Sequence, residues 1–178
     1  MARVAVRRPT WRHRKARAAM LTVAGLAMIS CWTAVQFVSP SPLLVINESR
    51  SLPRGLYRLA KAPVERGGIV AFTPPAAARV YLQGLGAPDD VRLLKRIVAV
   101  GGDLVCMRGG ELTIPGRHFT VAAHDRLGRS LPLWQDCRRL ERGEVFVLGD
   151  SDNSFDSRYF GPVLRSDTTG PYVEAIPW

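Results

Sequence analysis

One lysine in this sequence stands among apolar residues. The stretch Val91–Val100 has the composition of a buried strand, and side chains alternate between the two faces of a strand. Lys95 then shares its face with four apolar residues: Val91, Leu93, Ile97 and Ala99. Burial disfavours the charged ammonium and lowers its pKa, and a neutral lysine can act as a general base. The alternatives are an edge strand, from which the lysine reaches solvent, and an offset strand register that places Lys95 on the other face.

Two serines that could supply a nucleophile, Ser49 and Ser51, precede a rigid turn at Pro53–Gly55. Residues two apart in an extended stretch point to the same side, so the two hydroxyls lie together. One could attack a carbonyl carbon while the other, with a backbone N–H, stabilises the oxyanion. Serines before such a turn more often make local backbone hydrogen bonds, so the pair alone is weak evidence.

A third segment, 148–162, is a dense polar loop that follows an apolar strand. Its Asp, Asn and Ser residues, together with Arg158, predict a hydrogen-bonded network. The spacing of Asp150, Asp152 and Ser154 is similar to the start of a calcium loop, but the required Gly and Glu are missing from their positions. No Cys-x-x-Cys pair or Cys/His cluster occurs. We therefore expect neither calcium nor zinc.

Together, three stretches resemble the conserved boxes of the S26 type I signal peptidases, which are serine–lysine peptidases: Ser49-Arg-Ser51, Lys95–Asp103 and Gly149–Gly161. The resemblance implies a mainly β fold, a signal-peptidase-like antiparallel domain preceded by one N-terminal transmembrane helix. It also implies a serine-type endopeptidase that uses no metal or other cofactor. The third stretch would contribute a supporting ion pair, Asp156 with Arg158.

The resemblance also assigns catalytic roles by position. Ser51 would be the nucleophile and Lys95 the general base. The hydroxyl of Ser49 and the backbone N–H of Ser51 would form the oxyanion hole, and the hydroxyl of Ser154 would orient Lys95.

One stretch departs from the general signal peptidases, which usually carry a Met after the nucleophile and place the proline one residue later. The stretch Ser51–Tyr57 instead resembles the conjugative-transfer, TraF-type branch, as do Cys137–Leu140 and Gly143–Phe146. Members of that branch process pilin precursors, and some join the new ends into a ring. The fuller loop that begins at Gly149 keeps ordinary removal of signal peptides as an alternative. The expected partners are a precursor protein, membrane lipid and components of a type IV secretion system.

Most of the net charge of +10 comes from the N-terminus, where residues 1–17 hold seven basic side chains. The other 161 residues carry about +3, which gives no reason to expect a nucleic-acid partner. No charged residue follows Arg17 until Glu48.

The apolar segment 18–38 is long enough to cross a bilayer as a helix. Basic residues before it predict a cytoplasmic tail (1–17), a single-pass anchor in the inner membrane (18–38), a linker (39–42) and a periplasmic peptidase domain (43–178). A cleaved signal peptide is the alternative, but the segment is longer than a usual one and no clear Ala-x-Ala site follows.

Two of the three cysteines, Cys106 and Cys137, fall in the part expected to be exported into an oxidising compartment. They could form a disulfide, or they could be two buried free thiols, because spacing does not establish that their Cα atoms are close. Cys31 lies in the apolar segment, where it would pack as a small hydrophobe.

Short apolar runs broken by Gly and Pro predict the rest of the fold. The expected strands cover 43–46, 55–59, 68–73, 91–100, 103–107, 111–114 and 145–148, with one short helix over 76–82.

Two other functional classes compete with the serine–lysine interpretation. A Ser-His-Asp hydrolase would need His118 or His124, but the sequence has no Gly-x-Ser-x-Gly elbow to support it. A non-catalytic membrane scaffold of a secretion system would bind lipid through its basic tail. Such a scaffold would not need Ser51 or Lys95.

Overall fold

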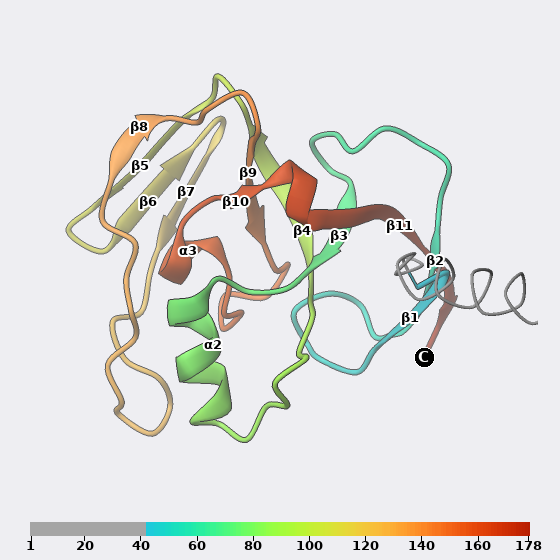
Figure 1. Cartoon of the computed structure of the whole chain (residues 1–178). Helices are drawn as coiled ribbons and strands as arrows, with labels where there is room; N and C mark the ends of the chain where they lie inside the picture. The colour runs from blue at the N-terminus through green and yellow to red at the C-terminus, as the bar shows by residue number, and fades with distance from the viewer. Residues whose placement is uncertain (1–41) are drawn as a thin grey trace, which may run out of the picture. The chain divides into compact units, whose positions relative to one another are not determined.

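A computed structural model of the chain describes residues 42–178 (Figure 1). The predicted cytoplasmic tail (1–17), the membrane anchor (18–38) and the linker up to residue 41 lie outside the described residues, as does Cys31. Within residues 42–178, no helix combines the length and the apolar character needed to span a bilayer.

The described part is built on two antiparallel sheets, which confirms the expected mainly antiparallel β architecture. The larger sheet has the order β1-β2-β11-β3-β4-β9-β10. Its strands are β1 (Leu44–Asn47), β2 (Gly55–Leu59), β11 (Thr168–Pro177), β3 (Ile69–Phe72), β4 (Leu93–Val100), β9 (Glu144–Leu148) and β10 (Val163–Leu164). The smaller sheet has the order β7-β6-β5-β8. Its strands are β7 (Arg117–Thr120), β6 (Glu111–Ile114), β5 (Leu104–Arg108) and β8 (Cys137–Arg139).

Three short helical segments accompany the sheets: α2 (Ala76–Gln83), α3 (Ser157–Phe160) and the 3-10 turn η1 (Arg165–Asp167). The first starts directly after Pro74-Pro75, because a proline can stand at a helix start, where an intrahelical N–H bond is not needed. In Figure 1, α2 lies just below α3, and α3 lies below β8.

β4 is an interior strand, paired with β3 on one side and β9 on the other. This position excludes the edge-strand alternative for Lys95. The expected shared face holds for Lys95 and Ile97 but is wrong for Ala99. A register shift between Ile97 and Ala99 leaves Val98 unpaired with β9, so Ala99 lies opposite Phe146 rather than on the face of Ile97 and Val147. Val91 precedes the strand.

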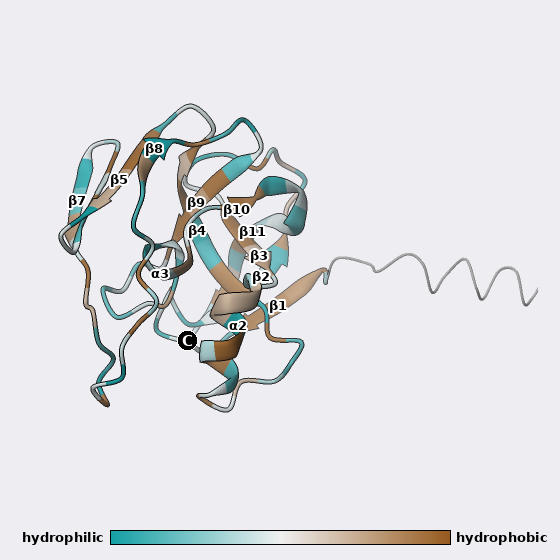
Figure 2. Cartoon of the chain, turned by 60° about the vertical axis from the view of Figure 1, so that its left-hand side comes forward, coloured by the Kyte–Doolittle hydropathy of each residue, from teal (hydrophilic) through white to brown (hydrophobic). Residues whose placement is uncertain are grey.

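The bulge divides the apolar core between the two faces of β4. Ile97 packs with Val70, Phe72 and Val147, whereas Ala99 packs with residues of the smaller sheet, such as Val105. Figure 2 shows the outer strand β7 as largely hydrophilic, while β1, one of the two edges of the larger sheet, is hydrophobic.

β11 is the strand that the sequence analysis missed most clearly. It lies between β2 and β3 although it contains Gly170-Pro171, and proline is normally confined to edge strands or bulges. A register shift between Thr169 and Tyr172 on the β3 side accommodates the dipeptide. The short strands β7, β8 and β10 and the single-turn helix α3 were also not expected.

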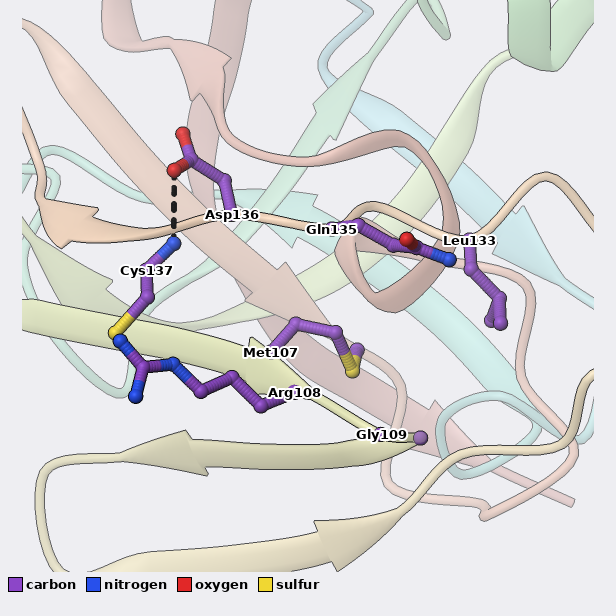
Figure 3. A pocket seen from close by; sticks show the side chains of 8 residues that line it. Met107, Arg108, Gly109, Leu133, Gln135, Asp136 and Cys137 are labelled. Carbon is purple, nitrogen blue, oxygen red and sulfur yellow. Dashed lines mark hydrogen bonds between the residues drawn. The ribbon is translucent and has the colours of Figure 1, made fainter.

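A disulfide joins Cys106 of β5 to Cys137 of β8, which lie opposite each other in the smaller sheet. It closes a loop with a sequence separation of 31, for which loop-closure entropy gives a stabilisation of about 3 to 4 kcal/mol. Beside it lies a pocket of about 710 Å³, and Figure 3 shows Met107, Leu133 and Asp136 among its walls. None of the predicted catalytic residues lines this pocket.

Candidate active site

A second, larger cleft of about 1170 Å³ brings together the side chains predicted to do chemistry. Ser49, Ser51, Lys95 and Ser154 all line it, although they come from the β1–β2 connection, from β4 and from the loop after β9. The predicted ion pair, Asp156 with Arg158, is buried and is not among the lining residues.

Lys95 is almost completely buried, with 4% of its surface exposed. It lies opposite Val70 of β3 and on the same face as Ile97. Burial lowers its pKa from 10.5 to about 8, because the ammonium loses its hydration, while the negative charge of Asp156 opposes the shift and Arg158 reinforces it. About one tenth of the amine is therefore neutral at pH 7 and can accept a proton.

Asn47 organises the loop that carries the two serines. It is the last paired residue of β1, opposite Gly55, so residues 48–54 form the hairpin connection. Its side-chain amide is buried and donates to the backbone carbonyls of Ser49 (3.1 Å), Leu52 (3.0 Å) and Pro53 (2.9 Å). The loop therefore folds around one amide group.

Ser51 is 8% exposed, and its hydroxyl lies 2.7 Å from the hydroxyl of Ser49. The Ser49 hydroxyl in turn donates to Asn47 Oδ1 at 2.8 Å. In the described part of the chain, no hydrogen bond joins Ser51 Oγ to the Lys95 amine. The two serine hydroxyls lie together as expected, but a bend and a turn at residues 49–51 bring them together, not an extended stretch. They form a short chain of hydrogen bonds that ends on Asn47.

Asp150 connects the serine loop to the strand of the lysine. Its backbone N–H donates to the carbonyl of Ser51, and its carboxylate accepts two hydrogen bonds from Arg96, at 2.9 and 2.8 Å. Because Arg96 is the neighbour of Lys95 on β4, these contacts fix the nucleophile loop relative to the lysine.

The predicted ion pair of Asp156 and Arg158 is fully inside the protein, at 0% and 2% exposure. Their side chains share two hydrogen bonds, at 2.8 and 2.7 Å. Arg158 also donates to the carbonyls of Ser151, Asp152 and Ser154. With every polar atom paired, this cation holds the polar loop in one shape.

Ser154 projects a buried hydroxyl that has no hydrogen-bond partner within residues 42–178. Gly149 makes room for it: a Cβ at Gly149 would overlap Ser154 and would come within 2.8 Å of the carbonyl of Ser51. An unpaired buried hydroxyl is costly, so Ser154 is available to a group in the cleft, such as the lysine amine or a substrate.

Within residues 42–178, neither histidine that a Ser-His-Asp hydrolase would require forms a hydrogen bond with the serine pair. His118 lies on β7, where its ring bonds to Thr113. His124 lines the cleft, but within residues 42–178 it shares no hydrogen bond with Ser51. The arrangement that can perform nucleophilic chemistry is the group of Ser49, Ser51, Lys95 and Ser154.

Comparison with known proteins shows the family of the chain. The family described as "Signal peptidase, peptidase S26" matches residues 14–177. The chain belongs to the S26 signal peptidase family. This match covers the strand of Lys95, the serine loop and the polar loop in a single alignment.

Curated relatives place the chain in the TraF-type branch of the S26 family. A plasmid transfer protein TraF from Escherichia coli is 37% identical over 75% of this chain and 82% of its own length. A conjugal transfer protein TraF from Agrobacterium fabrum is 32% identical over 70% and 77%. The signal peptidase I of Leptolyngbya laminosa is 27% identical over 74% and 61%. A solved signal peptidase I from Enterococcus faecalis is 27% identical over 62% of this chain and 97% of that chain, with a TM-score of 0.36.

Sequence reasoning missed three residues of this S26 site. Asn47 supports the serine loop, Asp150 joins that loop to β4, and Gly149 leaves room for Ser154. Gly149 and Asp150 lie in the stretch Gly149–Gly161 that resembles the family, but the resemblance gives neither of them a role. An Asn before a tight connection indicates a bond to the following backbone without naming its partners.

Proposed function

We propose that this chain is a serine endopeptidase in which Ser51 and Lys95 cleave exported precursor proteins during conjugative transfer. The observation that carries the proposal is the 4%-exposed lysine with a pKa of about 8 in the same cleft as a paired serine. The TraF relatives support the conjugative context.

The proposed reaction begins when neutral Lys95 takes the proton of Ser51 Oγ. The oxygen attacks the scissile carbonyl, and the resulting oxyanion is held by the Ser51 backbone N–H and the Ser49 hydroxyl. The C–N bond then breaks as the lysine ammonium gives its proton to the leaving amine. A water, deprotonated by the same amine, releases the acyl group and restores the serine.

A strand edge beside the serines, unpaired within residues 42–178, supports extended binding of the substrate. β1 is one of the two edges of the larger sheet, and Val45, Ile46 and Asn47 line the cleft. An extended peptide can pair with such an edge through main-chain hydrogen bonds. Binding of this kind would place its carbonyl groups next to the serine loop that follows β1.

The assignment is tested by Ser51→Ala and Lys95→Ala in the full-length protein, with a co-expressed candidate precursor as substrate. Both variants should abolish processing while the protein still folds. Ser166→Ala and Lys61→Ala are matched controls, because both residues are exposed and lie outside the cleft. Processing at the normal rate by either active-site variant would favour the non-catalytic scaffold.

The substrate is tested by mass spectrometry of a co-expressed candidate pilin. A product lighter by one water than the linear mature chain would indicate that the acyl group passes to the pilin's own amine. A linear product would indicate hydrolysis. Cleavage of many unrelated signal peptides, with no preference for pilin, would favour the second candidate, a general signal peptidase, which the Leptolyngbya relative supports.

The proposal includes a membrane location. The basic tail and the apolar segment 18–38 would anchor the chain in the inner membrane, with the tail in contact with cytoplasmic lipid and the peptidase domain in the periplasm. A precursor emerging from the export machinery would then meet the cleft at the membrane, near the type IV secretion components of a conjugative system.

A further inference from the structure

We propose that Asn47 is a positioning residue for the peptidase reaction, acting through the hydroxyl of Ser49. This inference rests on the proposed function. It adds a third polar residue to the serine pair, and it depends on hydrogen bonds whose directions can be worked out from their partners.

The orientation of the Asn47 amide follows from its surroundings. Its Nδ2 faces three backbone carbonyls, which can only accept hydrogen bonds. Its Oδ1 must therefore face Ser49 Oγ, 2.8 Å away. If the amide were flipped, its Oδ1 would face the three carbonyl oxygens of the loop, and none of these contacts could be a hydrogen bond.

This orientation assigns the hydrogens of both serines. Ser49 has one hydroxyl hydrogen, and Asn47 Oδ1 takes it because an amide oxygen can only accept. In the 2.7 Å contact between the two serines, Ser51 must then be the donor. In the resting protein, the hydrogen of the nucleophile thus points to Ser49.

The reaction requires both hydrogens to change partners. Ser51 must turn its hydrogen to Lys95, and Ser49 must turn its hydrogen from Asn47 to the oxyanion. Asn47 keeps Ser49 Oγ in a single position beside Ser51 before substrate binds, so only the hydroxyl hydrogen of Ser49 has to turn. Such pre-positioning of an oxyanion donor contributes to rate rather than to binding.

A double-mutant cycle between Asn47 and Ser49, in the full-length protein with a peptide substrate, tests the inference. Ser49→Ala should lower kcat about a hundredfold, and Asn47→Ala about tenfold, because Ser49 Oγ would no longer be held in one position beside Ser51. KM should stay within about twofold in both. The double variant should be no slower than Ser49→Ala alone, because Asn47 acts through the missing hydroxyl.

The pH profile provides a readout that a structural defect would not reproduce. Asn47 is uncharged and is not among the groups that shift the pKa of Lys95. The midpoint of kcat/KM against pH should therefore be unchanged in Asn47→Ala. Arg54→Ala, an exposed substitution in the same loop and outside the cleft, is the matched control and should leave kcat unchanged.

Additive losses in the double variant, or a rise in KM in place of the loss in kcat, would overturn the inference. If Asn47→Ala does not fold, Asn47→Ser replaces it in the cycle, since its hydroxyl still donates one hydrogen bond into the loop. Loss of activity in Ser51→Ala tests the proposed function separately. A normal kcat in Ser49→Ala would refute the role of Asn47 but not that of Ser51.

Discussion

Two opposing effects set the pKa of Lys95. Burial favours the neutral amine, and the negative charge of Asp156 favours the ammonium. Burial is the larger effect, so the pKa is about 8. This value leaves about one tenth of the amine neutral at pH 7.

If the neutral amine is the base, kcat/KM should rise about tenfold from pH 6 to 7 and level off above pH 8. The measurement is peptide cleavage across pH 5.5 to 9.5. A profile flat from pH 6 to 9 would show that Lys95 does not accept the proton.

The same pKa predicts an effect on stability. The folded pKa lies below the unfolded one, so the unfolded chain binds more protons between pH 8 and 10.5 and the wild type becomes more stable as pH rises through this range. Below pH 8 the full penalty, about 3 kcal/mol, is present. Lys95→Met should therefore increase the free energy of unfolding at pH 7, by an amount that shrinks towards pH 10.5.

Urea denaturation at pH 7 and at pH 10 measures this difference. Lys61→Met, at an exposed position, is the control and should change stability little at either pH. A Lys95→Met variant that is destabilised equally at both pH values would contradict the burial argument.

Among single residues, Ser51 and Lys95 could be proposed from the sequence as nucleophile and base, because each is a chemically distinctive residue in a matched motif. Asn47 could not be assigned a role, because its three carbonyl partners are created only when the loop closes. Ala99 was placed on the wrong face because a bulge at Val98 leaves no clear mark in the residues around it.

At the scale of the elements, the turn after β9 leaves no room for a side chain at Gly149. Gly149→Ala would push against Ser154 and the carbonyl of Ser51, so the serine loop and the polar loop would have to separate. We expect processing to fall more than a hundredfold while the sheets remain intact, since a misplacement of about 1 Å can cost that much in rate.

The measurement for Gly149→Ala is peptide cleavage together with circular dichroism. Gly143→Ala is the matched control, because a Cβ there meets nothing within 4 Å. Activity of Gly149→Ala near the wild-type level would show that the two loops do not need their close contact.

Most strands with clear apolar runs were predicted within two residues, and β2 and β6 were predicted at their observed bounds. The strands that were not predicted lack a clear apolar run in the sequence. β11 contains Gly170-Pro171, which is typical of a turn, but pairing on both sides makes it a strand. The strands β8 and β10 have three and two residues, which is too short for a periodic signal.

For the whole molecule, the charge distribution predicts topology. A C-terminal alkaline phosphatase fusion should be active, because that reporter folds only after export, and the protein should stay in the membrane fraction after a carbonate wash. Replacing the seven basic residues of the tail by neutral ones should reduce correct insertion. Release of the full domain in soluble form would instead indicate a cleaved signal peptide.

The bulge at Val98 divides β4 into two parts that contact different regions of the protein. Before the bulge, Lys95 lines the cleft and Arg96 pairs with Asp150. After the bulge, Ala99 packs with residues of the smaller sheet. The turn at Pro115-Gly116, between β6 and β7, therefore belongs to a part of the protein that does not set the geometry of the dyad. A fluorophore or an affinity tag inserted there would give a peptidase that can be followed or captured while it remains bound to its precursor.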